Sequence, residues 1–384
     1  MSTRFLSPCL SLLAATILIT ANASASEKTN TGSKQVLPRP DGNLADMTKP
    51  VQVFILLGQS NMVGLGKVTG PAVSLESAVK ERGKYKYLVD AAGQWGERRD
   101  VRYARVMDGR GGGVQRLNNE WLTVKTCKTI GPEFGIGHTL GDAVEDPVLL
   151  LKSCIGNRSL GWDLLPPGSE RYTFVSRDKQ GLEKTLVYAG YKDRPESWEM
   201  DKARGTATEP PPWLDKAGKP IDWYAGKQYD ADIAKAKMVL GELEKHYPGA
   251  KTYEVAGFFF WQGEKDCGNP GHAERYEKNL VHFIKTLRRE FNAPGAGFVL
   301  ATLGESQKGS KGPGGQVLDA QLAVDGEAGK YPEFKGNVAT VYTHPMAQGG
   351  SGNGHYGGKA EVYMDVGEAM GRAMTRLLGK AGPK

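Results

Sequence analysis

The chain has 384 residues, of which 39% are hydrophobic and 24% are charged, and its formal net charge is +7 at pH 7. This length is enough for one large α/β domain with a substantial core. The charge is moderate for a basic exported protein and leans only slightly toward an acidic glycan partner. Basic runs interleaved with aromatic residues, which would indicate nucleic-acid binding, do not occur.

The N-terminus is typical of a secretory signal peptide. A basic start at Arg4 is followed by an apolar run over 10–19 and then by small residues up to Ala25. Signal peptides have this order, and we expect cleavage after Ala23 or Ala25. The apolar run is too short for a membrane span, and no other stretch reaches ~18 apolar residues. We therefore expect residues 1–25 to be removed and the protein to be exported to the periplasm or the extracellular space.

The segment after the signal peptide, 26–48, is polar and rich in Pro, Gly, Lys and Thr. Such a composition predicts a disordered leader. The remaining residues, 49–380, are expected to form one folded domain with the two insertions described below.

Five short apolar runs, each bounded by turn residues, predict buried parallel strands at 51–57, 147–155, 255–261, 297–303 and 337–343. Helix-like stretches alternate with them near 131–143, 228–246, 272–292, 316–324 and 358–378. This alternation predicts a doubly wound α/β fold with a central five-stranded parallel sheet.

Two segments, about 66–130 and 157–227, do not fit this rhythm. The second is rich in Pro and Trp, which suits ordered surface loops. We interpret both as loop-rich insertions that build walls around a ligand, because ligands of open α/β sheets bind beyond the carboxyl ends of the strands.

The first predicted strand leads directly into Gly58-Gln59-Ser60-Asn61-Met62. A serine on a tight turn at the end of a central strand is a position at which an α/β enzyme exposes a nucleophilic hydroxyl. A serine that only caps a helix is the alternative.

Other predicted strands also end in polar residues. The second ends near Gly156, whose backbone N–H can approach a substrate closely. The third ends in Trp261-Gln262-Gly263-Glu264-Lys265-Asp266, which places an amide and two carboxylates on one loop. Three polar strand ends at one edge of a sheet indicate a functional site.

These blocks, together with a late His355, resemble the sialate O-acetylesterase and acetylxylan esterase branch of the SGNH hydrolases, also called carbohydrate esterase family six. The most specific blocks are Gly-Gln-Ser-Asn-Met after an apolar strand and Trp-Gln-Gly-Glu-x-Asp about two hundred residues later. The resemblance spans about 50–378. It implies a flavodoxin-like, three-layer α/β/α fold and hydrolysis of acetyl esters on sugars.

The resemblance also assigns roles. It implies that Ser60 attacks the ester carbonyl, and that the oxyanion is held by the amides of Ser60 and Gly156 with the side chain of Gln262. Each preorganised donor of this kind contributes ~3 kcal/mol in the transition state. Gln59 and Asn61, which flank the serine, are further candidates for substrate contacts.

A serine nucleophile needs a base that titrates near neutral pH, which points to histidine. Four of the six histidines (His138, His246, His272 and His282) lie on or beside predicted helices. Of the other two, His344 ends the last strand, whereas His355 lies in a Gly-rich loop before the last helix. The loop position fits the family pattern, in which the helix reads Ala-x-x-Tyr-x-x-x-Gly-x-x-Met, here Ala360, Tyr363, Gly367 and Met370. We therefore assign His355 as the base.

One departure from the pattern concerns the residue that orients the histidine. SGNH enzymes commonly have an aspartate three residues before it, but this position is Gly352. In the resembled branch the glutamate of the Gln-Gly-Glu block can serve, so Glu264 is the candidate and Asp266 the reserve. A backbone carbonyl is the third option.

Several other residues have less definite roles. Arg158 follows the Gly156 loop and is expected either to contact substrate or to form an internal ion pair. Glu133 follows Pro132 at a helix start, which suits a structural role. The tryptophans of the second insertion suit either sugar stacking or packing: Trp162, Trp213 and Trp223.

The predicted chemistry requires no metal or cofactor, and the sequence contains no cluster of metal ligands. After removal of the signal peptide three cysteines remain, Cys127, Cys154 and Cys267, and their spacing fits no zinc site. One disulfide with one buried thiol, or three buried thiols, are both compatible with export.

The leading hypothesis is therefore a secreted carbohydrate O-acetylesterase whose partner is an acetylated carbohydrate. Two alternatives belong to other classes. A noncatalytic glycan-binding relative is suggested by the missing aspartate, and an SGNH hydrolase for lipid or thioester substrates would need an apolar channel that the polar insertions do not predict. A nucleotide-binding protein is disfavoured because no glycine-rich phosphate loop follows the first strand.

Overall fold

The computed structural model describes residues 44–108, 114–177, 179–201, 203, 209–347 and 355–379. The expected signal peptide and the expected leader up to residue 43 lie outside these ranges. The described residues belong to one compact unit, Leu37–Lys384. Among them, no helix is both long and apolar enough to cross a lipid bilayer.

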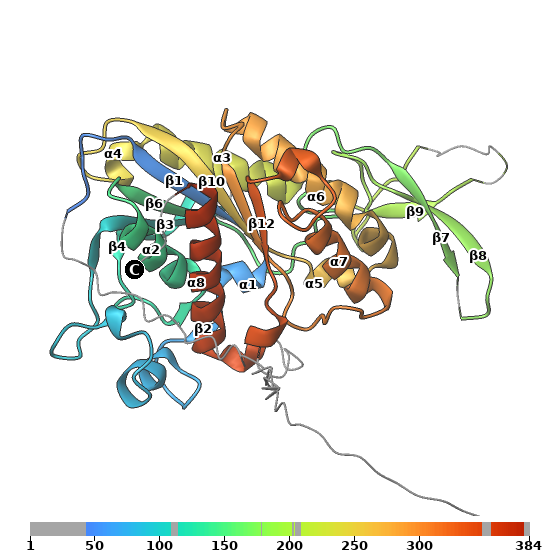
Figure 1. Ribbon diagram of the computed structural model, residues 1–384. Coiled ribbons are helices and arrows are strands. Elements are labelled where there is room, and N and C mark those ends of the chain that lie inside the picture. The colour runs from blue at the N-terminus through green and yellow to red at the C-terminus, as the bar shows by residue number, and fades with distance from the viewer. Residues whose placement is uncertain are drawn as a thin grey trace, which may run out of the picture. The chain divides into compact units, whose positions relative to one another are not determined.

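A seven-stranded sheet lies at the centre, in the order β12-β11-β10-β1-β6-β3-β4 (Figure 1). Neighbouring strands are parallel except for β3 and β4, which are antiparallel. The strands are β1 (Val51–Gly58), β3 (Arg98–Asp108), β4 (Val114–Leu122), β6 (Val148–Ser153), β10 (Tyr253–Trp261), β11 (Gly297–Ala301) and β12 (Val338–Val341).

The five predicted strands are confirmed as β1, β6, β10, β11 and β12. Numbered along the chain, they lie in the order 2-1-3-4-5, which is the order of flavodoxin-like sheets. In such sheets the ligand site is expected where the chain direction across the sheet switches, here at the carboxyl ends of β1 and β10.

The predicted number of five strands was too low, because β3 and β4 arise from the segment 66–130 that we expected to be loop-rich. β3 contains no apolar run. It carries Arg98, which is buried and lies 2.8 Å from the Asp100 carboxylate. A buried strand that neutralises its charges internally gives no hydrophobic signal in the sequence.

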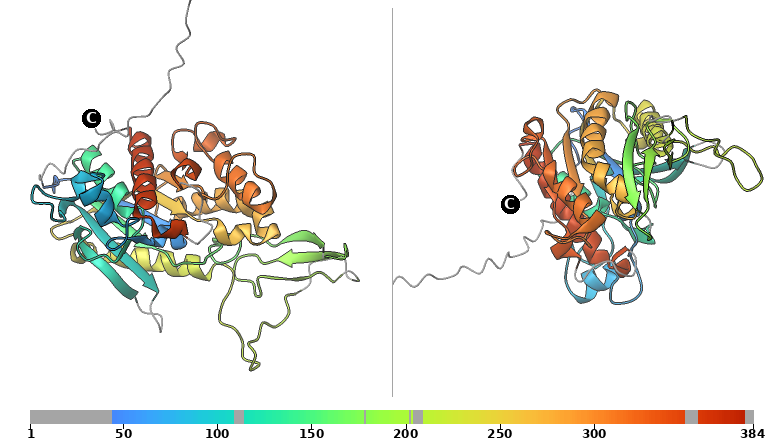
Figure 2. Two further views of the ribbon diagram at one scale, coloured as in Figure 1. Left: turned by 90° about the horizontal axis from the view of Figure 1, so that it is seen from below. Right: turned by 90° about the vertical axis from the view of Figure 1, so that its right-hand side faces the viewer.

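Helices cover both faces of the sheet, and Figures 1 and 2 show α8 and α3 on opposite sides of it. One layer contains α2 (Glu133–Ala143) and α8 (Ala360–Leu377). The other contains α3 (Lys227–Gly241), α6 (Pro270–Glu290) and α7 (Gly312–Ala323). The predicted helices and the three-layer arrangement are thus confirmed.

Side chains of β1 alternate between the two layers. Phe54 and Leu56 belong to the core beneath α2 and α8, whereas Val53 and Ile55 belong to the core beneath α3 and α6. Because both faces are buried, a parallel strand of this kind has a continuous apolar sequence.

The insertion 157–227 contains a separate three-stranded antiparallel sheet in addition to loops, formed by β7 (Tyr172–Arg177), β8 (Glu183–Tyr188) and β9 (Ser197–Glu199) (Figure 2). Tyr188 of this sheet donates a hydrogen bond to the Asn269 side chain, 2.7 Å away, directly before α6. The insertion is therefore attached to the central domain close to the carboxyl end of β10.

The remaining elements are short. They comprise α1 (Ser60–Val63), α4 (Leu243–His246), α5 (Glu264–Cys267), the paired β2 (Gly66–Lys67) and β5 (Thr129–Ile130), and the single turns Ser77–Glu81, Lys86–Leu88, Pro332–Phe334, His344–Met346 and His355–Gly358.

Candidate active site

The turn after β1 presents Ser60 at the carboxyl edge of the sheet. Gly58 has a φ of +146°, and a side-chain carbon there would lie 2.3 Å from the carbonyl oxygen of Trp261. Only glycine fits this combination of backbone angle and close approach. Ser60 is the first residue of α1, so its backbone N–H has no acceptor within that helix.

His355 lies next to this serine. Its Nε2 atom is 2.7 Å from Ser60 Oγ, which is hydrogen-bonding distance. The two residues are 295 positions apart in the chain. The pair predicted as nucleophile and base is therefore in direct contact.

The backbone around His355 has an uncommon conformation. His355 and Tyr356 have φ values of +55° and +57°, and two glycines with positive φ follow. Residues other than glycine are held in this left-handed region only by their surroundings, at a cost of about 1–3 kcal/mol each. Here the buried ring of Tyr356 stacks on Trp261, with centroids 5.9 Å apart.

Gly156 is also adjacent to the serine. A side-chain carbon at position 156 would lie 3.4 Å from Ser60 Cβ, and the following Asn157 has a φ of +55°. The loop after β6 thus brings its backbone against the Ser60 turn, and the approach of the Gly156 N–H to a substrate stays a prediction.

Gln262 is fully buried, and its amide is engaged with the protein. Nε2 donates to the carbonyl oxygen of Arg158 at 2.8 Å and to Asp266 Oδ2 at 2.6 Å. Tyr276 donates to its Oε1 at 2.9 Å. The same nitrogen also lies 3.4 Å from Gln59 Oε1. Donation by Gln262 to an oxyanion stays a prediction, and it would require this amide to exchange one of these acceptors for the oxyanion.

Asp266, the reserve candidate for orienting His355, holds the Gly156 loop instead. Its carboxylate accepts from the backbone N–H groups of Leu160 (2.9 Å) and Gly161 (2.8 Å) as well as from Gln262. Burial raises the pKa of this carboxyl to about 6, although the three hydrogen bonds act in the opposite direction. With its oxygens engaged in this way, Asp266 is a support for the loop.

Glu264 lies at the start of α5, and its Oε2 accepts a hydrogen bond from Gln59 Nε2 at 3.0 Å. Burial, and then the charges of Glu305 and Glu264, raise the pKa of the Tyr356 hydroxyl far above its ordinary value. The contact shown for the Glu264 carboxylate is thus with Gln59, the residue directly before Ser60. Its contact with the His355 ring stays a prediction.

The two residues beside Ser60 are both buried. Gln59 bonds to Glu264, and Asn61 donates to the Tyr356 hydroxyl at 3.4 Å. Both side chains therefore stabilise the turn through contacts within the protein.

Arg158 forms no ion pair among the described residues. Its Nε donates to Gln228 Oε1 at 3.1 Å, and its guanidinium lies over the Trp223 ring, 4.8 Å from the centroid. Trp162 and Trp213 contact each other edge to face, with centroids 5.8 Å apart. These tryptophans make packing contacts within the insertion.

The other histidines are engaged or buried elsewhere. His344 Nδ1 lies 2.7 Å from the Gly304 carbonyl oxygen, and His282 Nε2 lies 2.9 Å from that of Pro167. Burial lowers the pKa of the remaining three, to about 4 for His272 and well below the ordinary value for His138, with a smaller decrease for His246.

Neither a metal site nor a disulfide occurs among the residues that the structure describes. Their acidic, cysteine and histidine side chains form no group of three that could hold a metal ion. Cys127, Cys154 and Cys267 are free thiols, and burial raises the pKa of each to about 12. Such thiols are poor nucleophiles at neutral pH.

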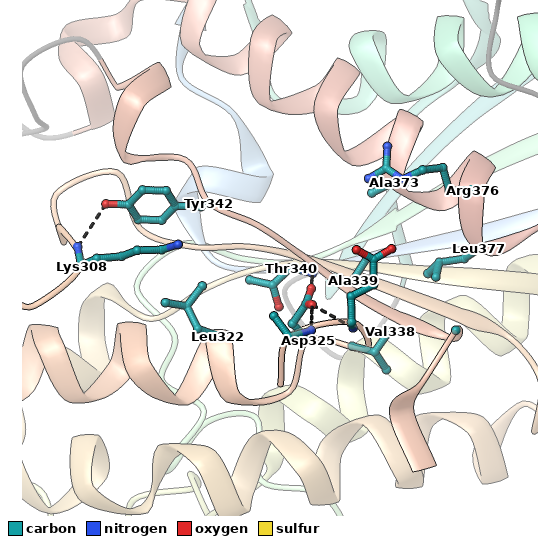
Figure 3. A pocket seen from close by; sticks show the side chains of 13 residues that line it. Lys308, Leu322, Asp325, Val338, Ala339, Thr340, Tyr342, Ala373, Arg376 and Leu377 are labelled. Atoms are coloured by element: carbon teal, nitrogen blue, oxygen red, sulfur yellow. Dashed lines mark hydrogen bonds between the residues drawn. The ribbon is translucent and has the colours of Figure 1, made fainter. Parts of the chain in front are cut away.

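A cavity of about 450 Å³ lies elsewhere, between α7, β12 and α8 (Figure 3). Lys308 and Arg376 border it, and none of the predicted site residues lines it. In its wall, Asp325 accepts the backbone N–H of Thr340 at 2.8 Å. This bond occupies an outward N–H of the edge strand β12, so the wall protects the sheet edge.

Sequence reasoning did not identify Tyr356 as a site residue, and it treated Glu133 as structural only. Tyr356 gave one signal, its position directly after His355 in a Gly-rich loop. Lys152, which contacts the turn after Ser60 through the carbonyl of Val63, gave the signal of a charged residue in an apolar strand.

One protein-family model matches the C-terminal part of the chain. Residues 214–376 match the model of a family described as "Carbohydrate esterase, sialic acid-specific acetylesterase". The matched range includes Gln262, Glu264 and His355, whereas Ser60 and Gly156 precede it. This part of the chain is therefore similar to a family of enzymes that hydrolyse esters on carbohydrates. No curated protein sequence matches the chain.

The solved structures that are similar to the chain include the following three. A protein from Arabidopsis thaliana has 16% identity and a TM-score of 0.43, with 85% of this chain and 98% of that chain covered. A carbohydrate acetylesterase from Xanthomonas citri has 16% identity and a TM-score of 0.43, with 84% of this chain and 55% of that chain covered. NanS has 11% identity and a TM-score of 0.37, with 78% and 79% covered.

Proposed function

We propose that this protein is a carbohydrate O-acetylesterase of the SGNH type, in the sialate O-acetylesterase and acetylxylan esterase branch. The observation that carries the proposal is the 2.7 Å distance between Ser60 Oγ and His355 Nε2 at the end of the central strand. The esterase-family match over residues 214–376 supports the same reaction class.

In the proposed reaction Ser60 Oγ attacks the carbonyl carbon of the acetyl ester while His355 Nε2 accepts the hydroxyl proton. The tetrahedral intermediate then expels the sugar oxygen, which takes this proton from His355. Water, deprotonated by the same histidine, then attacks the carbonyl carbon of the acetyl-enzyme. The bond from this carbon to Ser60 Oγ breaks, Ser60 Oγ takes the proton back from His355, and acetate is released. No metal or cofactor takes part in these steps.

The oxyanion of the intermediate is held by the backbone N–H groups of Ser60 and Gly156. Both belong to turns that approach each other closely, so the donors are preorganised. Gln262 is the third donor, with the exchange of acceptors described above. In the resting enzyme it connects the Arg158 carbonyl to Asp266 and thereby holds the Gly156 loop.

Glu264 is the proposed orienting residue for the His355 ring. Its position at the start of α5 and its hydrogen bond with Gln59, the residue directly before Ser60, support this role. Arg158 is the proposed contact for the sugar, because it follows the Gly156 loop and is only partly buried.

The test is hydrolysis of p-nitrophenyl acetate and of acetylated carbohydrates by the purified protein and by Ser60→Ala. Turnover that disappears in the variant is the expected result. A folded wild type that hydrolyses none of these esters but binds acetylated polysaccharide would refute the proposal in favour of a glycan-binding protein. Hydrolysis restricted to long acyl esters would instead indicate another SGNH substrate class.

We also propose that the protein is exported through its N-terminal signal peptide. The order of basic, apolar and small residues in the first 25 positions supports this. Mass spectrometry of the protein recovered from the periplasm or medium should show a new N-terminus after Ala23 or Ala25. Retention of Met1 in the cytoplasm would contradict it.

A further inference from the structure

A buried ion pair lies directly beneath the turn that carries Ser60. Lys152 of β6 is fully buried, and its Nζ is 2.6 Å from Oε2 of Glu133, the first residue of α2. Replacing a buried ion pair by apolar side chains is often neutral or stabilising. A contribution to the stability of the fold therefore does not by itself account for this pair, and its other contacts indicate its role.

The lysine also binds the end of α1. Lys152 Nζ donates to the carbonyl oxygen of Val63, the last residue of α1, at 3.2 Å. The last carbonyl groups of a helix have no hydrogen-bond donor within the helix. α1 has only one turn. Two backbone hydrogen bonds hold it, from the N–H of Val63 to the Gln59 carbonyl and from the N–H of Gly64 to the Ser60 carbonyl, and such a turn is marginally stable by itself.

Glu133 holds the backbone at Gly131, which packs against α1. Glu133 Oε1 accepts the backbone N–H of Gly131 at 3.0 Å, while its other oxygen binds Lys152. A side-chain carbon at Gly131 would lie 2.7 Å from the carbonyl oxygen of Met62, so this backbone lies directly against α1. The pair thus joins the start of α2 to both β6 and α1.

We propose that Lys152 and Glu133 are positioning residues that hold α1 so that Ser60 Oγ stays aligned with His355. The pair contacts α1 on the Val63 side, whereas His355 contacts it at Ser60. Neither residue touches the reacting atoms. The inference rests on the proposed function, since alignment matters only if Ser60 is the nucleophile.

The test compares Lys152→Met, Glu133→Gln and the double variant with wild type, using kcat and KM for p-nitrophenyl acetate and the Tm. Displacement of a nucleophile can lower the reaction rate up to about 100-fold. Lys152→Met should therefore lower kcat about 30- to 100-fold and change KM less than about threefold. Glu133→Gln leaves Lys152 without its countercharge and should lower the Tm. In the double variant the Tm should recover, because no unpaired buried charge remains, while kcat stays low.

Arg98→Met is the matched control, because Arg98 forms a buried ion pair with Asp100 and Asp142 away from α1. It should lower the Tm with kcat within about threefold of wild type. Recovery of kcat together with the Tm in the double variant, or an equal loss of kcat in Arg98→Met, would overturn the positioning role.

A second readout needs no turnover and separates this inference from the proposed function. The ¹⁵N shifts of the His355 ring, assigned with His355→Asn, should change in Lys152→Met and stay unchanged in Arg98→Met. Wild type that shows no Ser60-dependent turnover would refute the proposed function alone. Ring shifts that are the same in wild type and Lys152→Met would refute the positioning role.

Discussion

The side chain of Asn61 donates a hydrogen bond to the hydroxyl of Tyr356 at 3.4 Å, so the residues that directly follow Ser60 and His355 are joined to each other. The same hydroxyl accepts the backbone N–H of Gly304 at 3.3 Å. The turn after β1, the loop after β11 and the loop before α8 therefore meet at one oxygen atom. This atom fixes the spacing of the two residues that we assign to the reaction.

Replacing Tyr356 by phenylalanine tests this relationship. The ring that stacks on Trp261 remains, but two donors lose their shared acceptor, which should cost about 1 kcal/mol of stability. We expect kcat for p-nitrophenyl acetate to fall roughly three- to tenfold through misalignment, with KM little changed. Tyr342→Phe, which removes a hydroxyl that accepts from Lys308 outside the site, is the control. Equal kcat losses in the two variants would contradict the linking role.

The choice between the two late histidines gives a second prediction. His355 lies 2.7 Å from Ser60 Oγ, whereas His344 bonds to the carbonyl of Gly304. His355→Ala should lower kcat by several orders of magnitude, and His344→Ala should leave it within about tenfold. Steady-state kinetics of both variants, with circular dichroism to verify folding, decide the matter. The reverse pattern would make His344 the base.

The sequence predicted the parts of this site that follow apolar strands. Strands buried on both faces are continuous apolar runs, so β1, β6 and β10 could be located, and Ser60, Gly156 and Gln262 follow them. Parallel strands place their carboxyl ends at one edge, which brings these residues together. His355 required the resemblance to a family, since its loop has no periodic pattern.

Other parts depend on contacts that one sequence does not encode locally. β3 was not recognised because its buried Arg98 is neutralised by Asp100 and by Asp142 of another element. The acceptors of Gln262 come from the turn after β1, the loop after β6 and α5, which pack together only in the folded chain. Pair contacts over such distances, as between Lys152 and Glu133, are decided by packing rather than by local propensity.

The role of Glu264 gives a third prediction. An orienting carboxylate stabilises the imidazolium that forms when His355 takes the serine proton, and a neutral amide does this poorly. Glu264→Gln should therefore lower kcat by more than about 100-fold while the Tm changes little. The variant still offers an oxygen to Gln59, so that hydrogen bond is preserved. Activity within about tenfold of wild type would assign Glu264 to holding Gln59 and leave a backbone carbonyl to orient His355.

The last prediction concerns the pH dependence of stability. Burial raises the pKa of the Asp266 carboxyl to about 6 in the folded protein, whereas an aspartate in an unfolded chain has a pKa of about 3.9. The folded state therefore binds the Asp266 proton more tightly than the unfolded state does. The stabilisation that this proton gives to the folded state is fully present below about pH 4 and is lost as the pH rises through 6. The difference of about two pKa units corresponds to about 3 kcal/mol.

Asp266→Asn removes this titration, although it also places an amide among the backbone donors of Leu160 and Gly161 and should destabilise the protein at every pH. The free energy of unfolding, measured with urea at pH 4, 5, 6 and 7, should therefore show a gap between wild type and Asp266→Asn that narrows by up to about 3 kcal/mol toward pH 7. A gap that stays constant would mean that Asp266 titrates alike in both states. A gap that widens with pH would mean that the hydrogen bonds from Leu160, Gly161 and Gln262 outweigh burial and favour the ionised carboxylate.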